Sequence, residues 1–257
     1  MIFTLLYNEG SFMLSRNFRL QKVGDLRWLQ KNYNFSSVAF AIDELIVLDV
    51  TRGKKEIVTF CDHLKSLTEG CFVPIAAGGG VRSIEHAKTL LRSGADKVVI
   101  NTPLFNNPEL INDLAAEFGQ QCLVASLDIK LNDHKQYQLW MENGTKPVPG
   151  NLSDWLEKIN GYPVGEIYLN SIDQDGTGQG FDLKMLNYVP ESFSIPVIIA
   201  GGAGKYQHLA EGLSDTRVDA VATAHLFNFV GDGLKKARQG LKKENFKLAE
   251  WVSEKML

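Results

Sequence analysis

Apolar runs of strand length alternate with helical patterns along the whole chain. The runs are continuous rather than interrupted by polar residues, which is typical of parallel strands covered by helices. They lie at residues 2–6, 44–50, 72–77, 97–101, 122–128, 166–170, 196–200 and 220–224. Between them, helices are predicted to begin after Ser83, after Asn107 with a proline next, and after Asn151. Eight strand-then-helix units predict an α/β fold, a single closed (β/α)8 TIM barrel, with an open doubly wound sheet as the alternative.

The chain also repeats itself at an offset of 122 residues. Residues 74–105 align without gaps on residues 196–227, and the same offset superimposes Glu44 on Glu166. The coinciding pairs include Pro74 and Pro196, Gly79 and Gly201, Gly80 and Gly202, and His86 and His208. We therefore expect one domain over residues 1–257, with half-barrels at about 1–118 and 119–241 and a C-terminal helix to 257. A site at the joint of two such halves should use residues in symmetry-related pairs.

Composition limits the classes of partner and location. The 257 residues, 44% of them hydrophobic, suffice for one large core. A formal net charge of -3 gives no positive field for nucleic acid or a membrane surface, so neither is expected as a partner. The absence of a long apolar run or a signal-peptide pattern predicts a cytoplasmic protein. The three cysteines lack metal-ligand spacing and are expected to be buried, reduced thiols, with no metal site.

Two glycine-rich turns follow predicted strands, at Gly79-Gly80 and at Gly201-Gly202. Glycine lets backbone N–H groups approach a phosphate, and the following helix contributes its positive end. Each turn is accompanied by the next strand end, where the candidates are Asn101, Thr102, Ala224 and His225. Two such phosphate-binding turns at the carboxyl end of one barrel predict a substrate with a phosphate at each end. The alternative is that the glycines serve only tight turns. At the same face, residues 131–149 are too long for an ordinary loop and predict a mobile or hairpin-forming segment.

Several motifs carry a family resemblance over nearly the full chain. They are DELIVLDV (43–50), AGGGVRS (77–83), SGADKVVINT (93–102), QCLVASLDIK (121–130), GEIYLNSIDQDGTGQGFD (165–182) and PVIIAGGAGK (196–205). With them the chain resembles the cyclase subunit of imidazole glycerol phosphate synthase. The resemblance implies a heterodimer with a glutaminase subunit, whose ammonia passes through the barrel core. At the carboxyl face of the barrel the ammonia would react with a bisphosphorylated ribulosyl substrate to give imidazole glycerol phosphate and an aminoimidazole carboxamide ribotide, without a cofactor.

The resemblance assigns Asp128 to one of the family's two catalytic aspartates. A carboxylate there can accept a proton from ammonia or position it, although it could also simply cap a turn. The other aspartate belongs at position 6, where this chain has Leu6, and a lysine of the first-strand loop is replaced by Leu14. Leucine cannot transfer a proton. We therefore expect cyclisation in the histidine pathway to be slowed by about 10²–10⁴ for one lost acid–base group.

The resemblance also assigns the other roles. Asp49, Asp173 and Asp175 match substrate contacts, and Gly176 with Gly202 matches backbone phosphate donors, while His225 stands where serine is common. At the opposite face, Glu44, Lys97 and Glu166 match an ionic ring at the ammonia entrance. Asp96 and Gln121 match positions near the glutaminase.

Two further functions remain open. The chain also resembles divergent paralogues of surface-polysaccharide pathways that lack the first aspartate. Their resemblance implies an ammonia-delivering subunit that serves the amidination of a sugar in lipopolysaccharide synthesis, together with a synthetase-like protein. A non-catalytic ammonia conduit is the other alternative.

Overall fold

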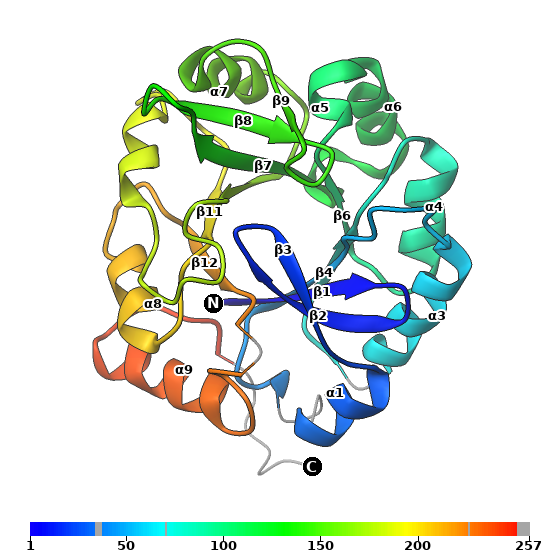
Figure 1. The fold of residues 1–257 in the computed structure, drawn as a ribbon, viewed down its shortest axis with the longest axis vertical. Coiled ribbons are helices and arrows are strands. Elements are labelled where there is room, and N and C mark those ends of the chain that lie inside the picture. The colour runs from blue at the N-terminus through cyan, green and yellow to red at the C-terminus, as the bar shows by residue number, and fades with distance from the viewer. Residues whose placement is uncertain (34–37, 70, 226, 251–257) are drawn as a thin grey trace.

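Eight parallel strands close into a barrel in a computed structural model that describes residues 1–33, 38–69, 71–225 and 227–250 (Figure 1). The strands are β1 (Ile2–Asn8), β4 (Glu44–Asp49), β5 (Ile75–Gly78), β6 (Lys97–Ile100), β7 (Leu123–Leu131), β10 (Glu166–Ser171), β11 (Val197–Ala200) and β12 (Ala220–Thr223). Each pairs with the next, β12 pairs with β1, and β10 pairs with β7. All eight predicted strands are present, and the closed barrel is confirmed over the open sheet.

Helices form a ring outside the barrel (Figure 1). They are α1 (Leu26–Asn32), α3 (Ile57–Thr68), α4 (Ile84–Arg92), α5 (Pro103–Asn106), α6 (Pro108–Phe118), α7 (Leu152–Asn160), α8 (Tyr206–Leu213) and α9 (Gly233–Lys243). Ser83 Oγ accepts from the N–H of His86 at 3.2 Å, and Asn151 Oδ1 accepts from that of Asp154 at 2.8 Å, so these caps are confirmed. Asn107 precedes α6 without a side-chain cap bond. After β10, the 3₁₀ helix η2 (Leu183–Tyr188) stands in for an α-helix.

The strand register follows the sequence repeat. Ile2 pairs with Glu44 as Val124 pairs with Glu166, and Ile46 pairs with Ala76 as Tyr168 pairs with Ile198. The gap-free alignment fails at the next strand, because Ala76 pairs with Lys97 whereas Ile198 pairs with Ala220. The connection between α8 and β12 is thus one residue longer than the corresponding connection between α4 and β6. Asn101 therefore corresponds to Ala224, and Thr102 to His225.

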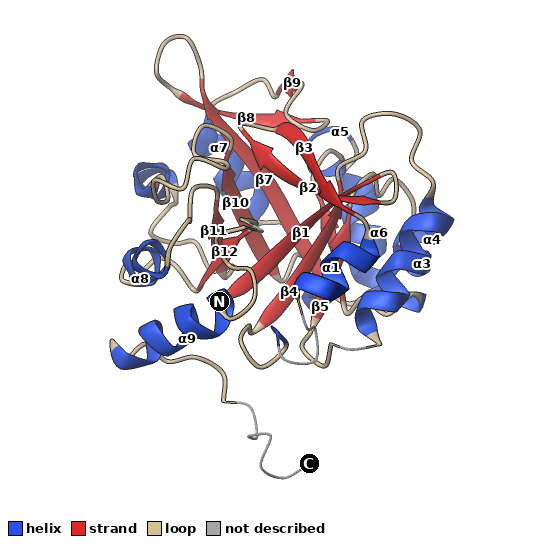
Figure 2. Ribbon diagram, turned by 60° about the horizontal axis from the view of Figure 1, so that its bottom comes forward, coloured by secondary structure: helices blue, strands red, loops and turns tan. Residues whose placement is uncertain are grey.

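Two antiparallel extensions rise from the carboxyl end of the barrel (Figure 2). Strand β7 continues into β8 (Tyr137–Met141) and β9 (Lys146–Pro147), so the long segment does form a hairpin. Strand β1 continues into β2 (Ser11–Arg16) and β3 (Arg19–Gly24), a hairpin that the hydrophobic pattern did not predict. Applying the offset of 122 to residues 131–149 would have pointed to it.

The expected C-terminal helix is shorter than predicted. Helix α9 ends at Lys243, and residues 246–250 are not helical, while residues 251–257 lie outside the described part of the chain. Asn245 adopts a left-handed conformation (φ 64°), and the N–H groups of Asn245 and Phe246 donate to the carbonyls of Lys242 and Leu241, each at 3.1 Å. This double bond pattern around a left-handed residue is a Schellman motif, which ends a helix.

The apolar core has two parts. The larger packs the outer faces of the strands against the helices. The smaller fills the barrel interior with Ile2, Ile46, Ala76, Val99, Val124, Tyr168, Ile198, Ala200 and Ala222. Cys61 is buried, but Cys71 and Cys122 are only partly so, and all three are free thiols. Within the described residues, every helix is too short or too polar to cross a membrane.

Candidate active site

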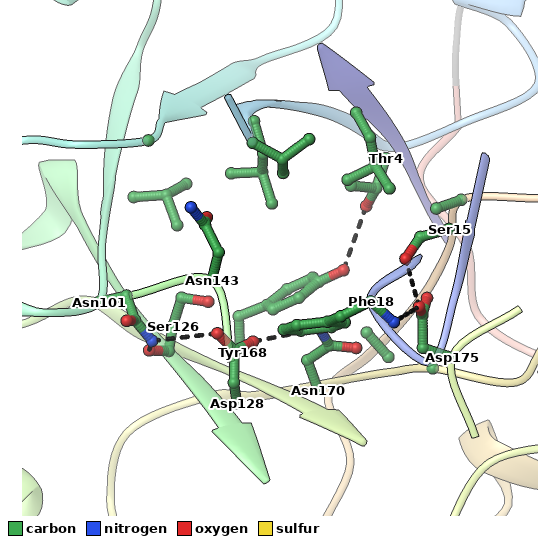
Figure 3. Close-up of a pocket in the computed structure, with 18 of the residues that line it drawn as sticks. Thr4, Ser15, Phe18, Asn101, Ser126, Asp128, Asn143, Tyr168, Asn170 and Asp175 are labelled. Carbon is green, nitrogen blue, oxygen red and sulfur yellow. Dashed lines mark hydrogen bonds between the residues drawn. The ribbon is translucent and has the colours of Figure 1, made fainter. Parts of the chain in front are cut away.

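One cavity at the carboxyl end of the barrel collects nearly all the predicted substrate residues. Its lining includes Asp49, Gly79, Gly80, Asn101, Thr102, Asp128, Asp175, Gly176, Gly201, Gly202, Ala224 and His225. They come from both half-barrels and surround the floor of the cavity, where Tyr168 and Asp128 lie (Figure 3). Asp173 is the predicted contact that is not part of this lining. Its Oδ2 accepts from the N–H of Leu131 at 2.8 Å and thereby holds the β7–β8 extension.

Asp128 is buried at the carboxyl end of β7 and is held by two amides. Its Oδ1 accepts from Asn170 Nδ2 at 3.2 Å, and its Oδ2 accepts from Asn101 Nδ2 at 3.3 Å. Burial raises the pKa of Asp128 to about 7; the bond from Asn170 opposes this shift and the charge of Asp175 adds to it. A carboxyl group that titrates near neutral pH is suited to accept and return a proton.

Leu6 occupies the position related to Asp128 by the repeat. Leu6 pairs with Leu48 as Asp128 pairs with Asn170. Leu6 and Leu14 both line the cavity, so an apolar wall faces the carboxylate across the barrel mouth. At this level of the barrel the second half therefore places a carboxylate where the first half places leucine.

At both glycine turns the main chain packs closely against the main chain of a neighbouring segment. Gly79 has φ 113°, and a Cβ there would lie 2.1 Å from the carbonyl oxygen of Asp49. Gly202 has φ 106°, and its Cβ would lie 2.0 Å from the carbonyl oxygen of Gly180. Tight packing therefore requires glycine at both turns, and both turns also border the same cavity. The need for glycine at tight turns is confirmed, whereas phosphate binding at these turns stays a prediction.

Asp49 and Asp175 hold their neighbours. Asp49 Oδ1 accepts from the N–H of Thr51 at 2.9 Å and lies 3.4 Å from Lys55 Nζ. Asp175 Oδ2 accepts from Ser15 Oγ and, at 3.0 Å, from the N–H of Phe18. Burial raises the pKa of Asp175. The two bonds from Ser15 and Phe18 to Asp175, which Figure 3 draws, fasten the β2–β3 hairpin over the cavity.

His225 borders the second glycine turn. Its Nδ1 accepts from the N–H of Asn228 at 3.3 Å, and burial lowers its pKa. Burial thus disfavours the positively charged form of the imidazole beside this turn.

Three cations of the cavity were missed by sequence reasoning: Arg52, Lys55 and Arg82. Arg52 and Lys55 follow the carboxyl end of β4, and Arg82 follows the first glycine turn. Their position after strand ends was the available signal. Nothing in the sequence separates Lys55 from its exposed neighbour Lys54.

The predicted ionic ring is assembled at the amino-terminal face. Lys97 Nζ donates to Glu44 Oε2 and to Glu166 Oε1, both at 2.7 Å. Burial lowers the pKa of Lys97, but the two carboxylates outweigh it and raise the pKa above its ordinary value. Burial raises the pKa of Glu44. Among the described residues, Glu44 Oε1 and Glu166 Oε2 are buried and find no hydrogen-bond partner.

Apolar side chains separate this ring from the cavity, apart from one polar pair. The hydroxyl of Tyr168 lies 3.3 Å from Thr4 Oγ1, and both residues line the cavity floor. Of the two residues predicted near a partner, Asp96 uses its Oδ2 to accept from the N–H of Ile75 at 2.8 Å. Gln121 is exposed in the short helix η1 (Gln120–Cys122) just before β7.

Comparisons with known proteins agree with the geometry. A family model described as histidine biosynthesis protein matches residues 29–231. A protein of Parasynechococcus marenigrum (strain WH8102), provisionally named imidazole glycerol phosphate synthase subunit hisF2, is 49% identical over 251 residues, or 97% of this chain and 93% of that protein. The imidazole glycerol phosphate synthase subunit HisF of Dictyoglomus turgidum is 38% identical over 80% of both chains. That of Pyrobaculum aerophilum is 41% identical over 73% of both.

Proposed function

Because the chain belongs to the histidine biosynthesis protein family, as a paralogue of the cyclase subunit of imidazole glycerol phosphate synthase, we propose that it is the ammonia-using subunit of a glutamine amidotransferase. Its ligand carries two phosphate groups, one at each glycine turn. Its chemistry depends on a single carboxylate, Asp128. The observation that carries this proposal is the buried Asp128, with a pKa near 7, on the cavity floor between Gly80 and Gly202.

The ammonia comes from a glutaminase subunit at the amino-terminal face. The ring of Glu44, Lys97 and Glu166 supports this, because an ionic cluster that is largely removed from water is costly and is weak evidence for stability alone. Ammonia entering there reaches the cavity through the barrel interior. In the cavity Asp128 accepts a proton from the attacking nitrogen or positions it, and the protonated carboxyl group returns the proton later.

The reaction itself has two candidates. With Leu6 and Leu14 in place of an aspartate and a lysine, the cavity lacks part of the apparatus for cyclisation in the histidine pathway. This change favours the second candidate, a specialised subunit that supplies ammonia for the amidination of a sugar. In a pure conduit, by contrast, Asp128 would have no role in product formation.

A restoration experiment separates the two candidates. The purified protein, with an ammonium salt at alkaline pH, is assayed for turnover of the ribulosyl substrate alongside Leu6→Asp and the uncharged control Leu6→Asn. Turnover by the natural protein with only a modest gain in Leu6→Asp supports the histidine reaction. Activity found in Leu6→Asp alone supports the specialised paralogue.

The conduit is tested in the complex reconstituted with its glutaminase. If Asp128 takes part in the chemistry, Asp128→Asn lowers ammonia-dependent product formation at least tenfold while glutaminase activity is retained. Unchanged product formation in this variant would leave a conduit as the function.

A further inference from the structure

The cavity at the carboxyl end of the barrel has an apolar side. It is built by β1, by the β2–β3 hairpin and by β4, which contribute Leu6, Leu14, Phe18, Leu20 and Leu48 to the lining. Leu6 pairs with Leu48 in the parallel register, so their side chains are neighbours on the same face of the sheet. We call these five residues the apolar wall.

The polar groups on this side of the cavity are engaged within the protein. In the β2–β3 hairpin, all of which the structure describes, Ser15 is the polar residue of the lining, and its hydroxyl donates to Asp175 Oδ2. On β1, Thr4 Oγ1 lies 3.3 Å from the hydroxyl of Tyr168. A ligand hydroxyl against the apolar wall would lose its contact with water and meet only hydrocarbon, which lowers affinity.

Hydrogen-bonding groups gather on the other side of the cavity. Asp128 and Ser126 of β7, Asn170 of β10 and Asn101, which follows β6, all line it. Figure 3 shows Asn101 and Ser126 on the side away from Ser15. The two sides therefore suit different parts of a ligand, one that hydrogen-bonds and one that does not.

Phe18 is held at the apolar wall in a strained conformation. Its φ of 62° lies in the left-handed region, which is unfavourable for a bulky side chain. Its N–H donates to Asp175 Oδ2 at 3.0 Å, and its carbonyl oxygen accepts from the guanidinium of Arg52. Its ring lies close to the β8–β9 turn, where a Cβ on Gly144 would be 2.6 Å from Phe18 Cδ2. Strain that the surroundings impose in this way is concentrated at ligand sites.

We propose that the ligand of this cavity presents an apolar face to the apolar wall, and that Leu14 and Leu20 are specificity-determining residues that favour such a ligand over a polyhydroxylated chain. Burying apolar surface of the ligand against leucine and phenylalanine is favourable, whereas burying hydroxyl groups there is not. The inference rests on the proposed phosphorylated ligand, because a phosphate group must anchor the molecule in the cavity.

The test compares phenyl phosphate with ribose 5-phosphate by calorimetric titration at pH 8. Both probes are phosphate monoester dianions, and they differ in the group beyond the phosphate. We expect phenyl phosphate to bind the wild-type chain at least tenfold tighter than ribose 5-phosphate. Leu14→Asn and Leu20→Asn should each lower this ratio at least fivefold. The matched control is Val58→Asn, at a residue of α3 that is 68% exposed, and it should change the ratio less than twofold.

The outcomes separate this inference from the function on which it rests. Equal affinity of the wild type for the two probes, or a ratio unchanged in both Leu14→Asn and Leu20→Asn, would overturn the role of the apolar wall while the phosphorylated ligand stands. A wild-type chain that binds neither probe would refute the phosphorylated ligand itself. Melting curves verify that each variant is folded, and Leu20→Asn keeps the test valid if Leu14→Asn is not.

Discussion

Replacing Asp128 with asparagine should make the protein progressively more stable relative to wild type as the pH rises from 5 to 8. The native carboxyl group keeps its proton up to about pH 7, whereas an unfolded chain releases it near pH 4. Because the native pKa is the higher one, folding loses stability as the pH rises from about 4 through 7. A shift of about three pKa units corresponds to a cost of about 4 kcal/mol at pH 8, of which about 1.5 kcal/mol is already present at pH 5.

Asparagine carries no charge in either state, so Asp128→Asn avoids this cost. Part of the gain is lost, because the new amide N–H meets Asn101 and Asn170, which now donate to the carboxylate. An imperfect hydrogen bond here costs about 1–3 kcal/mol at every pH. The pH dependence is therefore the quantity to measure: relative to wild type, the variant should gain about 2.5 kcal/mol between pH 5 and pH 8. For a chain of this length that is a relative rise in melting temperature of about 5–10 °C.

The assay is thermal unfolding by circular dichroism at pH 5, 6, 7 and 8. Asp133→Asn, at an exposed aspartate of the β7–β8 connection, is the matched control and should run parallel to wild type. If the Asp128→Asn curve were also parallel to wild type between pH 5 and pH 8, the raised pKa of Asp128 would be refuted, and with it the argument for proton transfer at neutral pH.

Three other variants probe the site. Lys97→Met leaves buried Glu44 and the 24% exposed Glu166 without their cation and should destabilise the chain by about 2 kcal/mol, measured by urea unfolding; adding Glu44→Gln and Glu166→Gln should restore most of the loss. Gly79→Ala should be among the most destabilising single methyl additions, because its Cβ overlaps the carbonyl oxygen of Asp49, and a melting temperature equal to wild type would contradict that packing. Asn170→Leu removes a bond that lowers the pKa of Asp128, so a carboxyl ¹³C NMR titration should move to higher pH; movement to lower pH would oppose the assigned cause.

The fold could be predicted from the sequence where burial is uniform. Strands covered on both sides leave continuous apolar runs, and all eight were recognisable. The β2–β3 hairpin was not, because it is largely polar and exposed in β3 and turns through Asn17 and Phe18, which adopt φ 50° and 62° without the usual glycine. The extra residue before β12 was hidden for a similar reason, since a gap in a polar connection leaves the hydrophobic pattern intact.

The sequence predicts which residues follow strand ends, and so which are candidates for the site, but not which of these candidates line the cavity. Asp173 and Asp175 are two residues apart and look equivalent in sequence. In the structure, Asp175 lines the cavity, whereas Asp173 holds a backbone N–H of the neighbouring extension. Lys54 and Lys55 present the same difficulty, because adjacent lysines in a loop point in directions that only the fold determines. Three-dimensional placement, not residue type, distinguishes the members of each pair.

The strand register at the two joints has a consequence for the origin and engineering of the chain. Val99 pairs with Val124 where the first half meets the second, and Ala222 pairs with Ile2 where the second meets the first, so the two seams are equivalent. Either half should therefore be able to form the same seams with a second copy of itself. A pair of first halves would contain two copies of Lys55 and no Asp128, and a pair of second halves the reverse. The two halves are therefore complementary: the first carries the cations of the cavity and the second carries Asp128, the carboxylate proposed to transfer protons. Replacing either half with a copy of the other would remove one of these two features.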